Sequence, residues 1–327
     1  MKSHVCEFES KQLLWLVGGP VLIPVLFAVL MQGGVWLGWL PSPRPALDTD
    51  RTILIHQAEA SRQPQAAEVL FLGDSSCLMN LSARQLSTAL GRPVLNLGNL
   101  SFLDAAAQAI LLREFATANP GRLKAVVLMM HPEALRRPGS EDYQLDALTR
   151  FLAGEDQKRA ESVAGRVSAA LGVEVFKGRI LARVLPAPLH GAYGRFYGFS
   201  ADLEKFMAKN LGSAVDPDVV PLTGSAEYRL SPALEKAARQ FKTAVPPGVK
   251  LLVALTPVPE KFAGESFRAR QSELLRQWSE WLSADALLSD LPATLPDEQF
   301  ARTTHLRPEA VRVYTEMLAA SLRRQLP

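Results

Sequence analysis

Short apolar runs alternate with longer amphipathic segments in the part of the chain after residue 66. The runs Val69–Leu72, Val94–Leu97 and Leu123–Met130 have the length and apolar character of buried strands. Residues 104–118 have helical spacing, with Asp104 suited to the N-cap and Asn119-Pro120-Gly121 to the stop. The resulting β-α-β-α-β order predicts a parallel sheet with right-handed crossovers.

The same alternation returns near the C-terminus. Val249–Leu255 predicts a fourth strand, residues 264–283 predict a helix, and Ala286–Leu291 predicts a weaker fifth strand. Pro308 suits the first position of a closing helix that runs to about Arg324. Residues 67–327 are therefore expected to form an α/β domain built on a parallel sheet.

Residues 136–247 interrupt this pattern, because they contain no convincing long strand. We expect a mostly helical insertion here. Two interpretations of it are open: an ordinary surface insertion, or a cap over the active edge that binds a sugar face through its aromatic side chains. The helix-like pieces and the aromatic, glycine-rich stretch are Tyr143–Leu152, Asp156–Leu171, Leu203–Asn210, Pro232–Ala244 and Gly191–Phe199.

The N-terminal region has a different character. Leu13–Leu40 contains no charged residue and is longer than the ~20 residues that cross a bilayer. Trp15 lies near one end and Trp36 and Trp39 near the other, as interfacial aromatics do. A cleaved signal peptide is the alternative, although the run is long for one and no small-x-small cleavage site follows. We expect a cytoplasmic tail (1–11), a transmembrane helix (12–40) and a linker (41–66), with the body outside the cytoplasm.

Composition excludes several classes of function. The 327 residues carry a net charge of only +3 and no basic run, so nucleic-acid binding is not expected. Neither a CxxC nor a His/Cys cluster with zinc spacing occurs, and we expect no metal and no cofactor. Cys6 and Cys77 lie on opposite sides of the predicted span, so they are not expected to form a disulfide.

The first candidate catalytic residues lie in the stretch 68–76. An apolar strand ends at Gly73-Asp74, two serines follow, and the leucine spacing beyond them predicts a helix. Such a turn lies at the carboxyl edge of the sheet, where open α/β sheets bind ligands. Ser75 is therefore either a nucleophile, with backbone N–H groups nearby to hold an oxyanion, or only a turn residue.

A serine nucleophile needs a base, and two of the five histidines follow strand regions at the same edge. They are His131 and His305. His305 lies just before the last helix, in a loop that can direct a side chain back towards the first strand. His4, His56 and His190 lie in the tail, the linker and the insertion.

Three short motifs, Gly73-Asp74-Ser75, Asn96-Leu97-Gly98 and Thr304-His305-Leu306, resemble those of the SGNH (GDSL-type) hydrolases. The resemblance covers roughly residues 68–135 and 249–325. It implies a flavodoxin-like three-layer sandwich with a five-stranded parallel sheet. It also implies that Ser75 is the nucleophile, that Gly98 donates an oxyanion N–H and that His305 is the base.

Two positions depart from that family's pattern. Arg302 stands where the family commonly has an Asp three residues before the His, and Asp297 is the nearest substitute in the same loop. Met129-Met130-His131-Pro132 stands where the family commonly has Gly-x-Asn-Asp, so His131 is the candidate for the missing oxyanion donor.

The predicted anchor followed by such a domain resembles proteins that O-acylate cell-envelope polymers beside a membrane-bound O-acyltransferase. The resemblance implies ester hydrolysis or acyl transfer on an envelope polysaccharide, outside the cytoplasmic membrane. The alternative is a catalytically inactive partner or scaffold of such an acyltransferase.

Overall fold

The computed structural model describes residues 49–99, 103–154, 200–224, 228–264 and 267–326, together with scattered positions between 11 and 37. The chain divides into two compact units, and the larger one, Leu47–Glu155 with Pro186–Pro327, holds every element named below. Most of the predicted span 12–40, the predicted helix Asp156–Leu171 and the stretch Gly191–Phe199 lie outside the described residues. Within the described positions, no helix combines the length and the apolar character that a bilayer crossing requires.

The larger unit is built on a five-stranded parallel sheet, which confirms the α/β prediction. The strand order is β2-β1-β3-β4-β6, which is the flavodoxin-like order of doubly wound folds. The last strand is shorter than predicted, because only Ala286 and Leu287 pair with β4. The strands are β1 (Val69–Gly73), β2 (Val94–Asn96), β3 (Ala125–Met130), β4 (Lys250–Leu255) and β6 (Ala286–Leu287).

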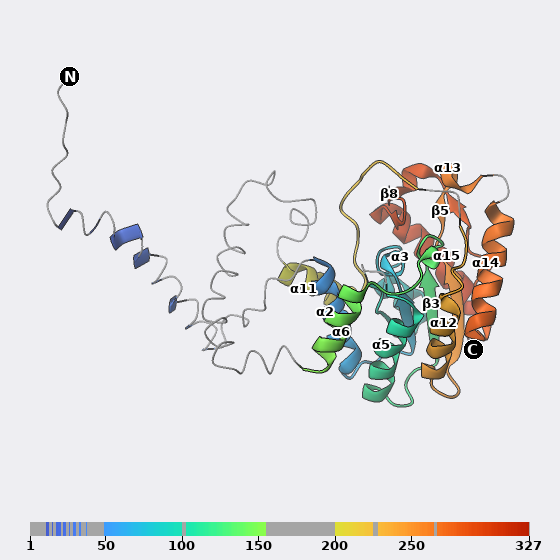
Figure 1. Ribbon diagram of the computed structural model, residues 1–327, viewed down its shortest axis with the longest axis horizontal. Coiled ribbons are helices and arrows are strands. Elements are labelled where there is room, and N and C mark those ends of the chain that lie inside the picture. Colours follow the sequence, from blue (N-terminus) through green and yellow to red (C-terminus); the bar gives the residue numbers. More distant parts are fainter. Residues whose placement is uncertain are drawn as a thin grey trace, which may run out of the picture. The chain divides into compact units, whose positions relative to one another are not determined.

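Helices cover both faces of the sheet, which makes three layers (Figure 1). In β1, Leu70 and Leu72 face one core, whereas Val69 and Phe71 face the other, because successive side chains alternate across a strand. Because both faces are buried, the sequences of the strands are continuous apolar runs. The first layer contains α2 (Thr49–Arg62), α5 (Ala105–Ala118), α12 (Leu234–Ala244) and α14 (Phe267–Leu282), and the second contains α4 (Ala83–Leu90) and α15 (Pro308–Gln325).

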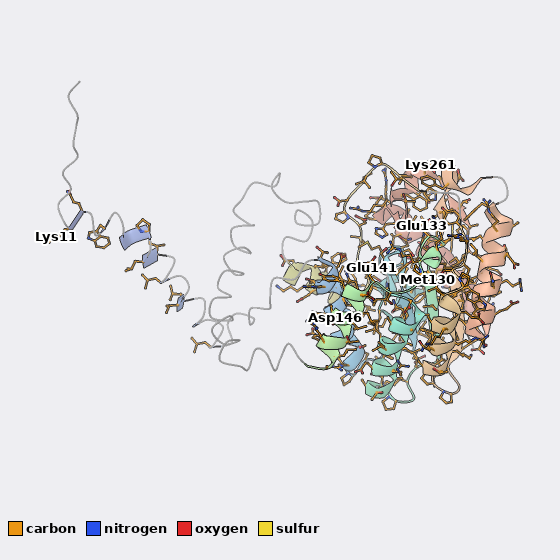
Figure 2. All side chains as sticks on the ribbon, viewed as in Figure 1. Lys11, Met130, Glu133, Glu141, Asp146 and Lys261 are labelled. Carbon is orange, nitrogen blue, oxygen red and sulfur yellow. The ribbon has the colours of Figure 1, made fainter. Side chains whose placement is uncertain are left out.

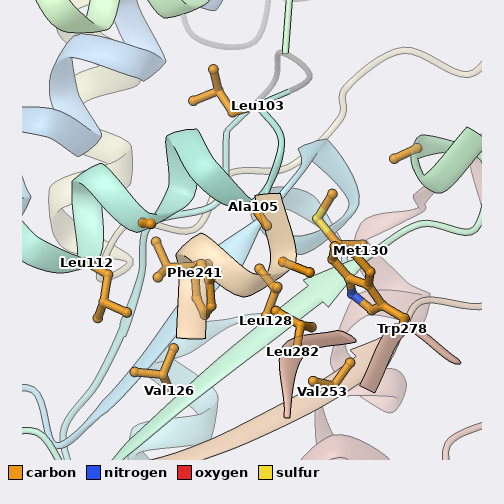
Figure 3. Close-up of a cluster of buried hydrophobic side chains, with 14 of the residues drawn as sticks. Leu103, Ala105, Leu112, Val126, Leu128, Met130, Phe241, Val253, Trp278 and Leu282 are labelled. Carbon is orange, nitrogen blue, oxygen red and sulfur yellow. The ribbon is translucent and has the colours of Figure 1, made fainter. Parts of the chain in front are cut away.

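Aromatic side chains from the helices fill the first core (Figure 3). Phe241 of α12 and Trp278 of α14 lie with Val126 and Leu128 of β3, and all four are buried. Full burial of such a side chain stabilises the fold by roughly 1.5–3 kcal/mol. Asp104 caps α5 as predicted, since its Oδ1 accepts the N–H of Ala107 at 3.0 Å.

The described part of the insertion is integral to the domain and is not a surface addition. Its last helix, α12, packs against α5 and α14 in the main helical layer. Its other described helices are α6 (Asp142–Leu152) and α11 (Ser200–Lys209), close to the predicted positions.

The chain after α11 runs beside the edge strand β2. The N–H of Asn96 donates to the carbonyl of Leu211 at 2.9 Å, and the N–H of Ala214 donates to the carbonyl of Leu78 at 3.1 Å. Gly212 lies between them with φ +87°, and a Cβ there would be 1.8 Å from the carbonyl oxygen of Asn96. Only glycine permits this approach, which brings the next residues to the carboxyl edge of the sheet.

Several short elements follow the carboxyl ends of the sheet's strands or precede the closing helix. The predicted loop before the closing helix contains an antiparallel hairpin of two short strands, which carries His305. These elements are α3 (Ser75–Met79), η1 (Ala134–Arg136), β5 (Val258–Pro259), α13 (Glu260–Ala263), β7 (Thr294–Leu295), η3 (Asp297–Gln299), β8 (Phe300–Arg302) and β9 (His305–Leu306).

Candidate active site

Ser75 is the first residue of α3 and stands directly after the turn that ends β1. Asp74 is the N-cap, and its Oδ1 accepts both the N–H and the hydroxyl of Ser76, at 2.9 and 2.6 Å. Gly73 is required at the turn, because a Cβ there would be 1.8 Å from the carbonyl oxygen of Met129. The turn therefore fixes Ser75, which is half-buried, at the carboxyl edge of the sheet.

His305 contacts Ser75, from which it is separated by 230 positions in sequence: its Nε2 lies 2.8 Å from the Ser75 Oγ. Asn80, the C-cap of α3, holds His305 in this position. Its Nδ2 donates to the carbonyl of Thr304 at 2.9 Å, and its Oδ1 accepts the N–H of Leu306 at 2.8 Å. One buried amide thus holds the residues on both sides of His305 against the helix that starts with Ser75. Sequence reasoning did not identify Asn80.

The carboxylate that holds His305 comes from the insertion. The Oδ2 of Asp216 lies 2.6 Å from the Nδ1 of His305, and only 1% of the Asp216 residue is exposed. The same oxygen accepts from the Nε of Arg302 at 2.5 Å, and the Asp216 Oδ1 accepts the N–H of Asp218 at 2.9 Å. Arg302 also pairs with the Asp218 carboxylate at 2.6 Å. Both oxygens of the buried carboxylate are therefore bonded.

These contacts keep Asp216 ionised. Burial raises the pKa of its carboxyl group. The hydrogen bond with His305, the N–H of Asp218 and the positive charges of His305 and Arg302 outweigh burial, so that the pKa lies below its ordinary value. An ionised carboxylate at Nδ1 selects the His305 tautomer whose Nε2 can take a proton from the serine hydroxyl.

The prediction that Asp297 holds His305 is wrong. Its Oδ1 accepts the N–H of Lys261 at 3.1 Å and so stabilises the start of α13 instead. Arg302 was the signal in the sequence, since a cation three residues before the histidine can pair with a carboxylate that lies near both. Asp216-Pro217-Asp218 supplies two, but 86 residues separate Asp216 from Arg302, and no local pattern connects them.

Gly98 is not a free oxyanion donor, contrary to expectation. Its N–H donates to the Asn96 Oδ1 at 2.8 Å. The Asn96 Nδ2 donates to the carbonyl of Cys77 at 2.9 Å, which fixes the orientation of the amide. The glycine is needed for packing, because a Cβ at residue 98 would be 2.5 Å from the backbone nitrogen of Leu78.

His131 lies at the same edge, directly after Met130, the last residue of β3, which is labelled in Figure 2. Its backbone N–H donates to the Asp74 Oδ2 at 2.9 Å. Its Nδ1 accepts the N–H of Glu133 at 3.1 Å, and its Nε2 is buried without a partner in the described part of the chain. Burial, followed by the positive charge of His305, lowers the pKa of His131 to about 3.

The described residues give less support to a cysteine nucleophile or to a metal centre. Burial, followed by the charge of Asp74, raises the pKa of the Cys77 thiol, which keeps it protonated and unreactive. No group of three or more His, Cys, Asp or Glu side chains in the described ranges has the arrangement of a metal site.

Comparison of the chain with protein-family models, curated proteins and solved structures finds no match. What the protein does is therefore inferred from its own residues. Chemically, the Ser75–His305–Asp216 arrangement can deprotonate a serine hydroxyl and stabilise the imidazolium that results.

Proposed function

We propose that the protein is a serine ester hydrolase or O-acyltransferase. One observation carries the proposal: a continuous chain of contacts from the Ser75 hydroxyl through the His305 imidazole to the Asp216 carboxylate, at 2.8 and 2.6 Å. Nucleophile, base and orienting carboxylate in this order are the arrangement that activates a serine for attack on an acyl group.

The reaction has two halves. The Ser75 Oγ attacks the ester carbonyl carbon while its proton passes to the His305 Nε2, and a tetrahedral oxyanion forms. The C–O bond to the leaving alcohol then breaks, and His305 returns the proton to that oxygen, which leaves an acyl-enzyme. Water or a sugar hydroxyl repeats the sequence in reverse and releases an acid or a new ester. In this proposal the N–H of Ser75, at the first position of α3, donates to the oxyanion.

The resemblance to SGNH hydrolases supports this proposal, with a different source for the carboxylate. The competing proposal is an inactive partner of an acyltransferase. An imidazole beyond about 4 Å from the serine hydroxyl, out of hydrogen-bond reach, would favour that alternative. The 2.8 Å contact supports an enzyme instead.

The proposed substrate class is an O-acylated cell-envelope polysaccharide or its acyl donor, handled outside the cytoplasmic membrane beside a membrane-bound O-acyltransferase. This part rests on the uncharged N-terminal run and on the resemblance alone. A transferase should pass acetyl from an aryl acetate to an added oligosaccharide, seen as the mass gain of one acetyl group, whereas an esterase should release only acetate.

Labelling by a fluorophosphonate probe tests the nucleophile. We expect wild type to be labelled at Ser75 and Ser75→Ala to remain unlabelled. Ser76→Ala is the matched control, because the Ser76 hydroxyl is fully buried and bonded to Asp74 and Thr256. It should still be labelled at Ser75. Equal labelling of wild type and Ser75→Ala would show that Ser75 is not the nucleophile.

A further inference from the structure

The segment that brings Asp216 to His305 begins at a strained point of the backbone. Residues 211–216, called the strap below, follow α11 and end at this carboxylate. Leu211 has φ +54°, in the left-handed region that residues other than glycine rarely adopt, and Gly212 follows with φ +87°. Strained conformations of this kind persist only where surrounding contacts hold them, and they are common at functional sites.

Gln57 of α2 holds the start of the strap. Its Nε2 donates to the carbonyl of Gly212 at 3.2 Å and to the carbonyl of Gly98 at 2.8 Å. Two carbonyl acceptors fix the orientation of the amide, because only its NH₂ group can donate to them. This fully buried side chain therefore joins α2 and the loop after β2 to the residue at which the strap turns.

The amide of Gln57 does more than fill space. Its Oε1 is buried and has no hydrogen-bond partner within the described residues. An apolar side chain of the same length, such as methionine, would avoid the cost of burying that oxygen. The two hydrogen bonds of Nε2 are therefore what a glutamine supplies at this position.

The strap connects the turn at Gly212 to Asp216 over four residues. Ala214, halfway between them, donates its N–H at 3.1 Å to the carbonyl of Leu78 in α3, the helix of the proposed nucleophile. The turn sets the path of the strap past α3, and with it the position of the carboxylate. The 2.6 Å contact between the Asp216 Oδ2 and the His305 Nδ1 tolerates little displacement.

We propose that Gln57 is a positioning residue of the catalytic site, which holds the strap at Gly212 so that Asp216 reaches His305. This role rests on the esterase or transferase function proposed above. Both α2 and the strap lie outside residues 68–135 and 249–325, over which the chain resembles the SGNH hydrolases. The orienting carboxylate and the side chain that holds its segment are therefore features of this chain.

A double-mutant cycle on the hydrolysis of an aryl acetate tests the role. Gln57→Met keeps the length of the side chain and removes both bonds, so we expect kcat to fall about 10- to 10²-fold with little change in KM. In the Asp216→Asn background the same change should have almost no further effect, because a residue that acts through Asp216 has lost its role there. Wild-type kcat in Gln57→Met, or an equal loss in both backgrounds, would show that the inference is wrong.

Ser61→Ala is the matched control on the same helix. The buried Ser61 hydroxyl donates to the carbonyl of Ala58 within α2, so this variant loses a hydrogen bond without changing a contact of the strap, and it should keep wild-type kcat. Thermal unfolding shows which variants are folded at the assay temperature. Gln57→Asn, which withdraws the amide by one methylene group, is the milder second variant and should show the same dependence on Asp216.

Proton NMR tests the position of Asp216 independently of activity. An Nδ1–H of His305 that is donated to a carboxylate gives a far-downfield resonance, assigned by its loss in Asp216→Asn. It should remain in Ser61→Ala and disappear or move upfield in Gln57→Met, and an unchanged resonance there would overturn the inference. A wild type that neither labels with fluorophosphonate nor turns over would instead defeat the proposed function, and the resonance would still decide the role of Gln57.

Discussion

Replacing Asp216 by Asn removes one charge from the centre of the site while keeping the shape of the side chain. Three donors converge on this carboxylate: the Asp218 N–H on Oδ1, and Arg302 Nε and His305 Nδ1 on Oδ2. An amide offers only one acceptor oxygen, so in either orientation its NH₂ group faces at least one of these donors. In the orientation that keeps the Asp218 bond, that NH₂ faces the His305 Nδ1 and favours the tautomer that cannot take the serine proton.

We expect Asp216→Asn to lower kcat by about 10³- to 10⁴-fold, the effect of a wrong tautomer in a serine triad. That loss corresponds to about 4–5.5 kcal/mol of transition-state stabilisation. Hydrolysis of an aryl acetate measures it, with labelling of Ser75 by fluorophosphonate as a second reading that should slow in parallel.

Asp297→Asn is the matched control, since the loop position alone would make Asp297 the orienting carboxylate. Because the Asp297 carboxylate accepts the N–H of Lys261, and Asp216 is the carboxylate that contacts the His305 Nδ1, this variant should keep nearly wild-type kcat. If Asp216→Asn retains wild-type activity, or if Asp297→Asn is equally impaired, the assignment of the carboxylate is refuted.

Three further predictions follow from neighbouring residues. Asn80→Ala removes the two hydrogen bonds by which a buried amide holds the backbone on either side of His305. Urea titration should therefore show a loss of about 2–4 kcal/mol in the free energy of unfolding, and activity should fall with it; wild-type stability would contradict this role. Arg302→Gln removes a cation that lowers the pKa of Asp216, so the acid limb of the pH profile of kcat/KM should move to higher pH. An unchanged acid limb would show that the Arg302–Asp216 ion pair is only structural. The pKa of His131 is about 3 in the folded protein and about 6.5 in the unfolded chain, so the unfolded chain binds more protons between these pH values. The contribution of His131 to the free energy of unfolding should therefore be fully present above pH 6.5 and should fall by about 1.4 kcal/mol per pH unit below it. His131→Asn should reduce that slope, and an unchanged difference between urea titrations at pH 7 and pH 5 would count against the buried, uncharged ring.

Much of the fold was readable from local patterns. Apolar runs such as Leu123–Met130 predicted strands that are buried on both faces, and Asp104 predicted the start of α5. Burial and capping depend on side chains a few positions apart, which is why periodicity predicts them. The fifth strand was overestimated, because its extent depends on pairing with β4. The membrane span over residues 12–40 stays a prediction.

Ser75 and His305, the proposed nucleophile and base, were candidates from the sequence by itself, because the apolar pattern predicted that each follows a strand region at the carboxyl edge of a parallel sheet. Only the tertiary structure decided which carboxylate holds His305, that the Gly98 N–H is occupied, and that Asn80 fixes the hairpin. Each of these depends on a hydrogen bond between segments distant in sequence, such as the 89 positions between Asp216 and His305. Hydrogen bonds require particular atoms within about 3 Å, and sequence spacing cannot specify such distances until the whole chain has packed.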